Sequence, residues 1–454
     1  MATPAPNPLI AGTVAAAGHT LDTAILLPTF SIADNQSCQP ESIDQIGPLT
    51  PVGGLPLFLR TVLTLQRSGI ANLVVLSGVE EDLLKRLLTQ DSRVVAIVRW
   101  MPMREFPPED ARTWEVAAQH IQGACLVIGA RTVFSQGLIE QLRRHVEVRG
   151  GQHVVVTPYV GDTHSAEATE IMVVSAGLLN GAGWRAVPVR HRTPLHLIKA
   201  QAEAEGRLQS TPIGMDSSQW CQTLCLLSTV EEAEQRLLQA PKGPYDGVID
   251  TYFNRKVANR LTRLFVKAGW SPNAITSLSI LIGLLSAVLF AQGAYVTGVM
   301  GALLFQVSAI VDCCDGDVAR LTFRESAFGE RFDIIGDNVV HMAIFGALGW
   351  AGYANGGGSL FLALGLLAMI GNGFSLWAVM RMKGRDARQG WASPVQAKRS
   401  AFIVKNLASR DFSIVVLLFA VLNLLNVFLW LAAIGSNVFW MMTAWITRSP
   451  SLRA

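Results

Sequence analysis

The sequence lacks several features that define common classes of protein. Its opening residues, MATPAPNPLIAGTVAAAGH, contain neither the basic start nor the apolar core of a secretory signal, so we expect the first part of the chain to stay in the cytoplasm. The six cysteines show no paired spacing typical of a zinc site, and we interpret all of them as reduced thiols. The net charge of +3 is small and no basic run with interleaved aromatic residues occurs in the first half, so nucleic acid is not an expected partner.

Charge is scarce beyond Pro272, where apolar runs reach about twenty residues, the length that a helix needs to cross a bilayer. Six spans are expected: 273–290, 296–310, 332–350, 360–380, 412–424 and 427–446. The segment 381–410 holds eight basic residues and one acid, whereas the turns on the opposite side hold no charge. Six crossings place every basic loop and both termini on the positive-inside side. The sequence therefore predicts a multi-pass protein of the inner (cytoplasmic) membrane with its N-terminal domain and both termini in the cytoplasm.

Before this membrane domain, short apolar runs alternate with amphipathic helical patterns. Strands are expected at 23–30, 71–78, 124–130 and 151–160, and helices at 56–70 and 228–240, the last capped by Ser228 or Thr229. Such alternation is typical of an α/β domain with a largely parallel sheet covered on both faces. The predicted fold class is thus an N-terminal α/β domain followed by an all-α polytopic membrane domain.

The linker between these parts ends in a basic amphipathic helix. It places Val257, Leu261, Leu264 and Phe265 on one side among five basic residues, as in a helix on an anionic membrane surface. The alternative is a solvated basic helix packed on the first domain. The expected organisation is a tail (1–20), an α/β domain (21–240), the linker with its juxtamembrane helix (241–271), the membrane domain (272–447) and a tail (448–454).

An unusually acidic stretch, VDCCDGDVARLTFRESAFGERFDIIGD (residues 311–337), lies at an expected membrane boundary. Asp312 and Asp315 are three residues apart and share one helix face, and Asp333 and Asp337, four apart, share another. Two antiparallel helices would bring both pairs together, where the carboxylates repel unless cations compensate them. Divalent ions with oxygen ligands meet that need, and two such ions can clamp a pyrophosphate.

The same stretch resembles the motif of the CDP-alcohol phosphotransferase family at every fixed position. The match runs Asp312-x2-Asp315-Gly316-x2-Ala319-Arg320-x8-Gly329-x3-Asp333-x3-Asp337, and the wider resemblance covers about 246–445. It implies transfer of a phospho-alcohol group from a CDP-alcohol donor to an acceptor hydroxyl, with release of CMP. The expected partners are that donor, a lipid or polyol (phosphate) acceptor, membrane lipid and a second copy of the chain in a homodimer.

The resemblance also implies roles for individual residues. Two Mg²⁺ or Mn²⁺ ions would be held by Asp312, Asp315 and Asp333, with Asp337 as a further metal carboxylate that takes the acceptor's proton. The nucleotide would be bound by Gly316, Ala319, Arg320 and Gly329, with Arg320 on the diphosphate. Asp317 occupies an unspecified position of the motif, and we expect it to be solvated or to stand behind the ligands.

The first domain carries a second resemblance. The stretch GPLTPVGGLPLFLRTVLTLQRSGIANLVVLSG is similar to the core of Rossmann-like sugar-nucleotide and inositol-phosphate nucleotidyltransferases, and the fusion resembles bifunctional inositol-phosphate cytidylyltransferase/di-inositol-phosphate-phosphate synthases. However, residues 28–47 contain no Gly-x-Gly and no Arg or Lys to bind a triphosphate. Ala130 stands where a metal-binding aspartate is expected, and a second one is absent near 227–228. We therefore expect a non-catalytic domain, the alternative being an active version with rearranged ligands.

Donor and acceptor remain open at this stage. A soluble donor such as CDP-inositol is favoured by the fused domain, and CDP-diacylglycerol with a polar alcohol such as inositol phosphate or glycerol phosphate is the alternative. An acceptor phosphate could be bound by basic residues of the 381–410 segment, whose charge would otherwise serve topology. These residues are Arg385, Arg388, Lys405 and Arg410. A cation- or proton-coupled transporter is the alternative of another class.

Overall fold

The computed structural model describes residues 21–28, 46–108, 110–129, 131–148, 155–160, 167–168, 171–179, 208–212, 218–224, 226–239, 255–389 and 412–448. The chain divides into two compact units, Met1–Pro241 and Lys242–Ala454, which are described separately. The expected tail at 1–20, all but the first residue of the expected tail at 448–454, and the first part of the expected linker, 241–254, lie outside the described residues.

The first unit is built on an eight-stranded sheet with the order β11-β8-β10-β6-β1-β4-β5, in which β9 also pairs with β8. The neighbours β6, β1, β4 and β5 are parallel, whereas β10 runs antiparallel to both β6 and β8. Strands buried on both faces have continuous apolar sequences, as in TAILL of β1 and ACLVIG of β6. The bounds are β1 Thr23–Leu27, β4 Asn72–Ser77, β5 Ile97–Pro102, β6 Ala124–Gly129, β8 Val155–Val160, β9 Glu167–Ala168, β10 Ile171–Ser175 and β11 Leu208–Pro212.

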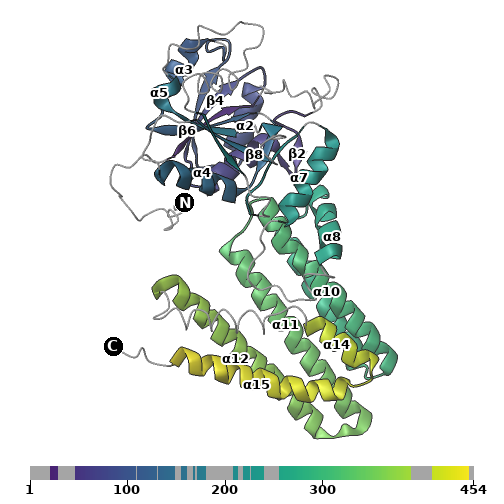
Figure 1. Ribbon diagram of the computed structural model, residues 1–454. Coiled ribbons are helices and arrows are strands. Elements are labelled where there is room, and N and C mark those ends of the chain that lie inside the picture. The colour runs from purple at the N-terminus through teal and green to yellow at the C-terminus, as the bar shows by residue number, and fades with distance from the viewer. Residues whose placement is uncertain are drawn as a thin grey trace, which may run out of the picture. The chain divides into compact units, whose positions relative to one another are not determined.

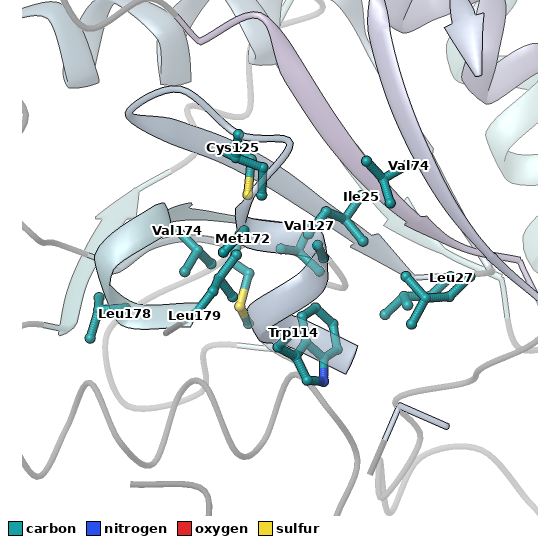
Figure 2. Packing of buried hydrophobic residues seen from close by; sticks show 14 of the residues in the cluster. Ile25, Leu27, Val74, Trp114, Cys125, Val127, Met172, Val174, Leu178 and Leu179 are labelled. Atoms are coloured by element: carbon teal, nitrogen blue, oxygen red, sulfur yellow. The ribbon is translucent and has the colours of Figure 1, made fainter. Parts of the chain in front are cut away.

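Helices cover this sheet, and Figure 2 shows the core beneath α3 and α5. Trp114 of α3 is fully buried against sheet residues such as Val127 and Met172, and its indole Nε1 donates to Pro108 O at 2.8 Å. The predicted α/β fold class of this part is therefore confirmed, with a parallel centre and a mixed flank. The helices are α1 Leu57–Arg67, α2 Glu81–Gln90, α3 Ala111–Ala118, α4 Gln136–Val148, α5 Ala176–Leu179 and α7 Leu227–Gln239.

The predicted cap of α7 is wrong, because the helix begins one residue before Ser228. Thr229 instead binds back to the residue before the helix: its Oγ1 accepts from Leu226 N at 3.1 Å and donates to Leu226 O at 2.6 Å. Because the Thr229 hydroxyl is bonded to the backbone of Leu226, which precedes the helix, it does not cap the residues that follow it.

Two small antiparallel pairs flank the main sheet: β7 (Thr132–Phe134) with β12 (Cys221–Thr223), and β2 (Pro51–Val52) with β3 (Leu55–Pro56). The β2–β3 turn uses positive φ angles at Gly53 (56°) and Gly54 (80°), which favour glycine. Arg60 of α1 donates to Val52 O and Gly53 O at 2.9 and 3.0 Å. Gly53 N donates to Glu234 of α7 at 2.8 Å, so side chains of two helices hold the backbone of this turn.

The second unit is entirely helical in its described part (Figure 1). Five helices are long and apolar enough to cross a membrane, and the predicted fifth span is the shorter helix α14. Five of the six predicted spans are thus candidates, and the sixth is not confirmed, because α14 has only ten residues. The helices are α8 Arg255–Lys267, α9 Pro272–Ala291, α10 Tyr295–Leu321, α11 Ala327–Gly352, α12 Ser359–Gln389, α14 Phe412–Val421 and α15 Leu425–Arg448, with a π-helical turn, η6, at Tyr353–Gly357.

Helix α8 packs on the membrane unit through part of its apolar side. Ala258 is fully buried in a cluster with residues of α9 and α10, and Leu261 and Phe265 pack against that cluster. Val257 and Leu264 are exposed. The single apolar side expected from the sequence is therefore divided between a packed face and an exposed one.

Candidate active site

The acidic stretch forms the end of α10, a tight turn and the start of α11. Helix α10 stops because Phe323 adopts a left-handed conformation (φ 53°), after which Arg324 N donates to Ala319 O at 2.8 Å. Ser326 then caps α11, its hydroxyl accepting from Gly329 N at 3.0 Å. Helix geometry thus extends through the motif on both sides of the turn, as expected from the two aspartate pairs that each share a helix face.

Three aspartates of the motif come together at this turn. Asp312 and Asp315 of α10 are each 5% exposed, and Asp333 of α11 is half-buried. One carboxylate oxygen of each lies within 4.8 Å of the others, an arrangement that could hold a metal ion. Because every donor is a carboxylate oxygen, the set suits a hard divalent cation such as Mg²⁺ or Mn²⁺. Asp337 lies one turn beyond Asp333 on α11, half-buried, and is not part of this group.

Helix α9 contributes hydroxyl groups that the sequence analysis missed. Thr276 Oγ1 donates to Asp315 Oδ2 at 2.5 Å, and Ser279 Oγ lies 3.4 Å from Asp312 Oδ1. Both residues are almost fully buried. Their three-residue spacing places them on one helix face, which was a usable signal in SPNAITSLS, but nothing in that pattern alone connects this face to α10.

The motif glycines mark close approaches. A Cβ added at Gly329 would lie 3.2 Å from Asn273 Oδ1, so the beginnings of α9 and α11 meet there. A Cβ added at Gly316 would lie 3.3 Å from Arg320 Nη1, so the guanidinium lies over Gly316. Gly316 and Ala319 are half-buried and Arg320 is exposed, which leaves one open stripe along the end of α10.

Asp317 differs from the expectation of a solvated side chain. It is 5% exposed, and its Oδ1 accepts from Arg320 Nη2 at 2.6 Å. The expected alternative, a position behind the site residues, agrees with this geometry.

The predicted acceptor-binding cations are described only in part. Arg385 and Arg388 lie on the final turns of α12, of which only the backbone is described, and Lys405 and Arg410 lie outside the described residues. In the first unit, Ala130 and residues 29–45 of the expected phosphate-binding loop also lie outside them.

Several long apolar helices, with a cluster of carboxylates where α10 turns into α11, are the features of a multi-pass membrane protein, and this cluster could hold a cation. Residues 270–447 match the family model of the CDP-alcohol phosphatidyltransferases. The second unit therefore contains a CDP-alcohol phosphatidyltransferase domain, as the motif resemblance predicted.

Two curated relatives of the chain have names that give two activities. A bifunctional IPC transferase and DIPP synthase of Aquifex aeolicus is 37% identical over 120 residues, 26% of this chain and 27% of that protein. The protein of the same name from Archaeoglobus fulgidus is 25% identical over 316 residues, 64% of this chain and 60% of the relative. Among solved structures, the inositol-1-phosphate CTP transferase from T. maritima is 11% identical with a TM-score of 0.36, covering 48% of this chain and 97% of that one. The chain thus spans less than two thirds of these curated relatives.

Proposed function

We propose that the protein is a metal-dependent membrane transferase that moves a phospho-alcohol group from a CDP-alcohol to an acceptor hydroxyl and releases CMP. The clustering of Asp312, Asp315 and Asp333 at the α10–α11 turn, within a segment that matches the family model, is the observation that supports this most directly. A transporter is less favoured, because these carboxylates gather beside one helix turn instead of being distributed along several spans.

In the reaction, the acceptor oxygen forms a bond to the donor phosphorus that carries the alcohol, and the bond from that phosphorus to the oxygen of CMP breaks. Asp337 accepts the proton of the acceptor hydroxyl, since an alcohol is a weak nucleophile until its proton is removed. Arg320 binds the diphosphate, and the open stripe of Gly316 and Ala319, with Gly329 opposite, lets the nucleotide approach the helix backbones.

Asp312, Asp315 and Asp333 would hold two Mg²⁺ or Mn²⁺ ions, with Asp337 as a further ligand. These ions would supply positive charge to the diphosphate and to the departing CMP. The protein's own part is to hold the carboxylates together, through the α9 hydroxyls and the short turn between α10 and α11.

For the donor, we favour a soluble CDP-alcohol such as CDP-inositol, in inositol-phosphate or phospholipid synthesis. A CDP-diacylglycerol-dependent reaction with inositol phosphate or glycerol phosphate is the second candidate, and basic residues on the last turns of α12, Arg385 and Arg388, would then bind the acceptor phosphate. We also propose a homodimer, which light scattering of the purified protein would test.

The decisive test is CMP release by purified protein in nanodiscs. We expect release with Mg²⁺ or Mn²⁺ and one member of a panel of CDP-alcohols, no release with EDTA, and a loss of at least about 100-fold in Asp337→Asn. Glu325→Gln, an exposed acid in the turn, is the matched control and should retain activity. Unchanged release in Asp337→Asn would contradict the assigned base, and nucleotide-independent ion flux would favour the transporter.

A further inference from the structure

In the sequence, Asp317 lies between Asp315 of the carboxylate cluster and the arginine that the proposed function places on the diphosphate. It follows Asp315 by two residues and precedes Arg320 by three on α10. The Asp317 side chain is 6% exposed and the Arg320 side chain 47% exposed, and a 2.6 Å ion pair joins them. The acidic end of the pair is therefore buried, while the guanidinium remains open to a ligand.

The pair bends the Arg320 side chain back along its own helix. Helical side chains lean toward the N-terminus, so a residue covers the turn before it. Here the guanidinium covers Gly316, where an added Cβ would lie 3.3 Å from Nη1 and 3.5 Å from Nη2. Gly316 directly follows Asp315, so the guanidinium covers the residue next to a member of the cluster that would hold the metal.

Resting on the proposed function, we propose that Asp317 is a positioning residue that holds Arg320 against Gly316 in the orientation needed to bind the donor's diphosphate. An arginine has five N–H donors, so the bond to Asp317 leaves others for phosphate oxygens. Holding the side chain before binding removes the entropy that a free arginine would lose on binding. Asp317, at a motif position to which no role is assigned, would thereby contribute to the affinity for the donor.

Asp317 could also have the opposite effect and weaken the binding of the diphosphate, and a binding measurement distinguishes the two. A buried carboxylate near an anion site could weaken binding, by repelling the diphosphate and by competing for the guanidinium. Removing its charge would then tighten binding, whereas loss of a positioning residue weakens it. The sign of the change in affinity therefore decides between the two roles.

The experiment measures binding of CDP with Mg²⁺ to the full-length protein in nanodiscs by calorimetry. We expect Asp317→Asn to weaken binding about tenfold, Asp317→Glu to retain most of the affinity, and Glu325→Gln to leave it unchanged. Asp317→Asn is then repeated in an Arg320→Ala background, where it should have no effect, because a positioning residue acts through its partner.

Tighter binding in Asp317→Asn, or an equal loss with and without Arg320, would overturn the proposal. Thermal unfolding of each variant shows whether Asp317→Asn merely destabilises the protein. A general loss of stability would also be seen in the Arg320→Ala background. Failure of the unsubstituted protein to bind CDP would count against the proposed function itself, and against Asp317 with it. Normal CDP binding that is insensitive to Asp317 would overturn this inference alone.

Discussion

Thr276 occupies one oxygen of an aspartate that belongs to a cluster of carboxylates. Its hydroxyl donates to Asp315 Oδ2 at 2.5 Å and so helps to fix the orientation of this carboxylate. A neutral donor stabilises a carboxylate without bringing a positive charge that would compete with a metal ion. Groups that orient metal ligands in this way are often nearly as important as the ligands themselves.

We therefore predict that Thr276→Val lowers the affinity for Mn²⁺ by about 10- to 100-fold, whereas Thr276→Ser keeps most of it. Ser277→Ala is the matched control, because Ser277 is exposed on the same helix and its hydroxyl donates to Asn273 O. Titration followed by electron paramagnetic resonance measures the affinity directly. Equal affinities in Thr276→Val and Ser277→Ala would show that the hydroxyl does not support the cluster.

Arg60 offers a second prediction, in the first unit. It is 4% exposed, and burial lowers its pKa from its ordinary value to about 10, so it remains charged at neutral pH. Arg60→Met leaves Val52 O and Gly53 O without their donor, and we expect a loss of about 3 kcal/mol in the free energy of unfolding of this unit.

This loss should be the same at pH 6 and pH 8. The folded-state pKa, about 10, lies below the unfolded one, so the two states begin to bind different numbers of protons on Arg60 only as the pH approaches 10, well above both values tested. The free energy of unfolding is measured in a denaturant series in which proteolysis reports the unfolded fraction. Arg86→Met, at an exposed helix position, is the control. A loss of stability at only one of the two pH values would contradict the conclusion that Arg60 is charged at both.

At the scale of helices, α9 and α11 approach closely through glycine. A Cβ at Gly336 would clash with Ile280, and one at Gly283 would lie 2.5 Å from Val340 Cγ1. This contact fixes the distance between the hydroxyl face of α9 and the aspartates of α11. Where helices approach this closely, an added methyl group cannot be accommodated unless the neighbouring side chains or helices move.

Gly336→Val should therefore push the two helices apart, lower stability by about 1–3 kcal/mol and reduce CMP release more strongly. The double variant Gly336→Val with Ile280→Ala should recover part of both, since it restores space at the same contact. Gly373→Ala, at a glycine with open space around it, is the control. Lack of rescue by Ile280→Ala would indicate that Gly336 acts through something other than this contact.

The motif predicted α10 and α11 well, because spacings of three and four residues specify which side chains share a helix face. It could not predict the partners of those faces. Thr276 and Ser279 face α10 because of how the helices pack, which apolar periodicity does not encode. The Asp317–Arg320 pair, three residues apart on one helix, was predictable from its spacing but was missed. The sequence likewise indicated four buried strands, but β10 was not among them, and a fully apolar run such as IMVVS does not show in which direction it would pair.

For the whole molecule, the direction of α15 bears on how often the chain crosses the membrane. Asn437 Nδ2 donates to Leu367 O at 3.0 Å, and further along both helices the rings of Trp440 and Phe374 lie 5.1 Å apart. Helices α12 and α15 therefore run parallel, as Figure 1 also shows, and both end on the same side. A chain that leaves α12 must cross back before α15 begins.

Helix α14 provides that return in part. At about 1.5 Å per residue its ten residues span roughly half of a bilayer's hydrocarbon. Its first residue, Phe412, packs on Phe305 in the middle of α10, and its last, Val421, accepts a hydrogen bond from Tyr295 at the start of α10. It thus lies along the half of α10 that is remote from the carboxylates.

We predict from this that both termini lie on the side of the carboxylate cluster, in the cytoplasm, as six crossings require. Arg381, whose guanidinium lies 5.1 Å from the Trp377 ring centroid, marks the basic end of α12 on that side. Fusions of a fluorescent reporter that matures only in the cytoplasm should be bright at both ends of the chain, and a periplasmic phosphatase fused after Arg448 should be inactive. A reporter after Gly357, in the turn before α12, is the control and should give the reverse. An active phosphatase at the C-terminus would mean five crossings, and α15 would then have to run opposite to α12, against the contacts that join them.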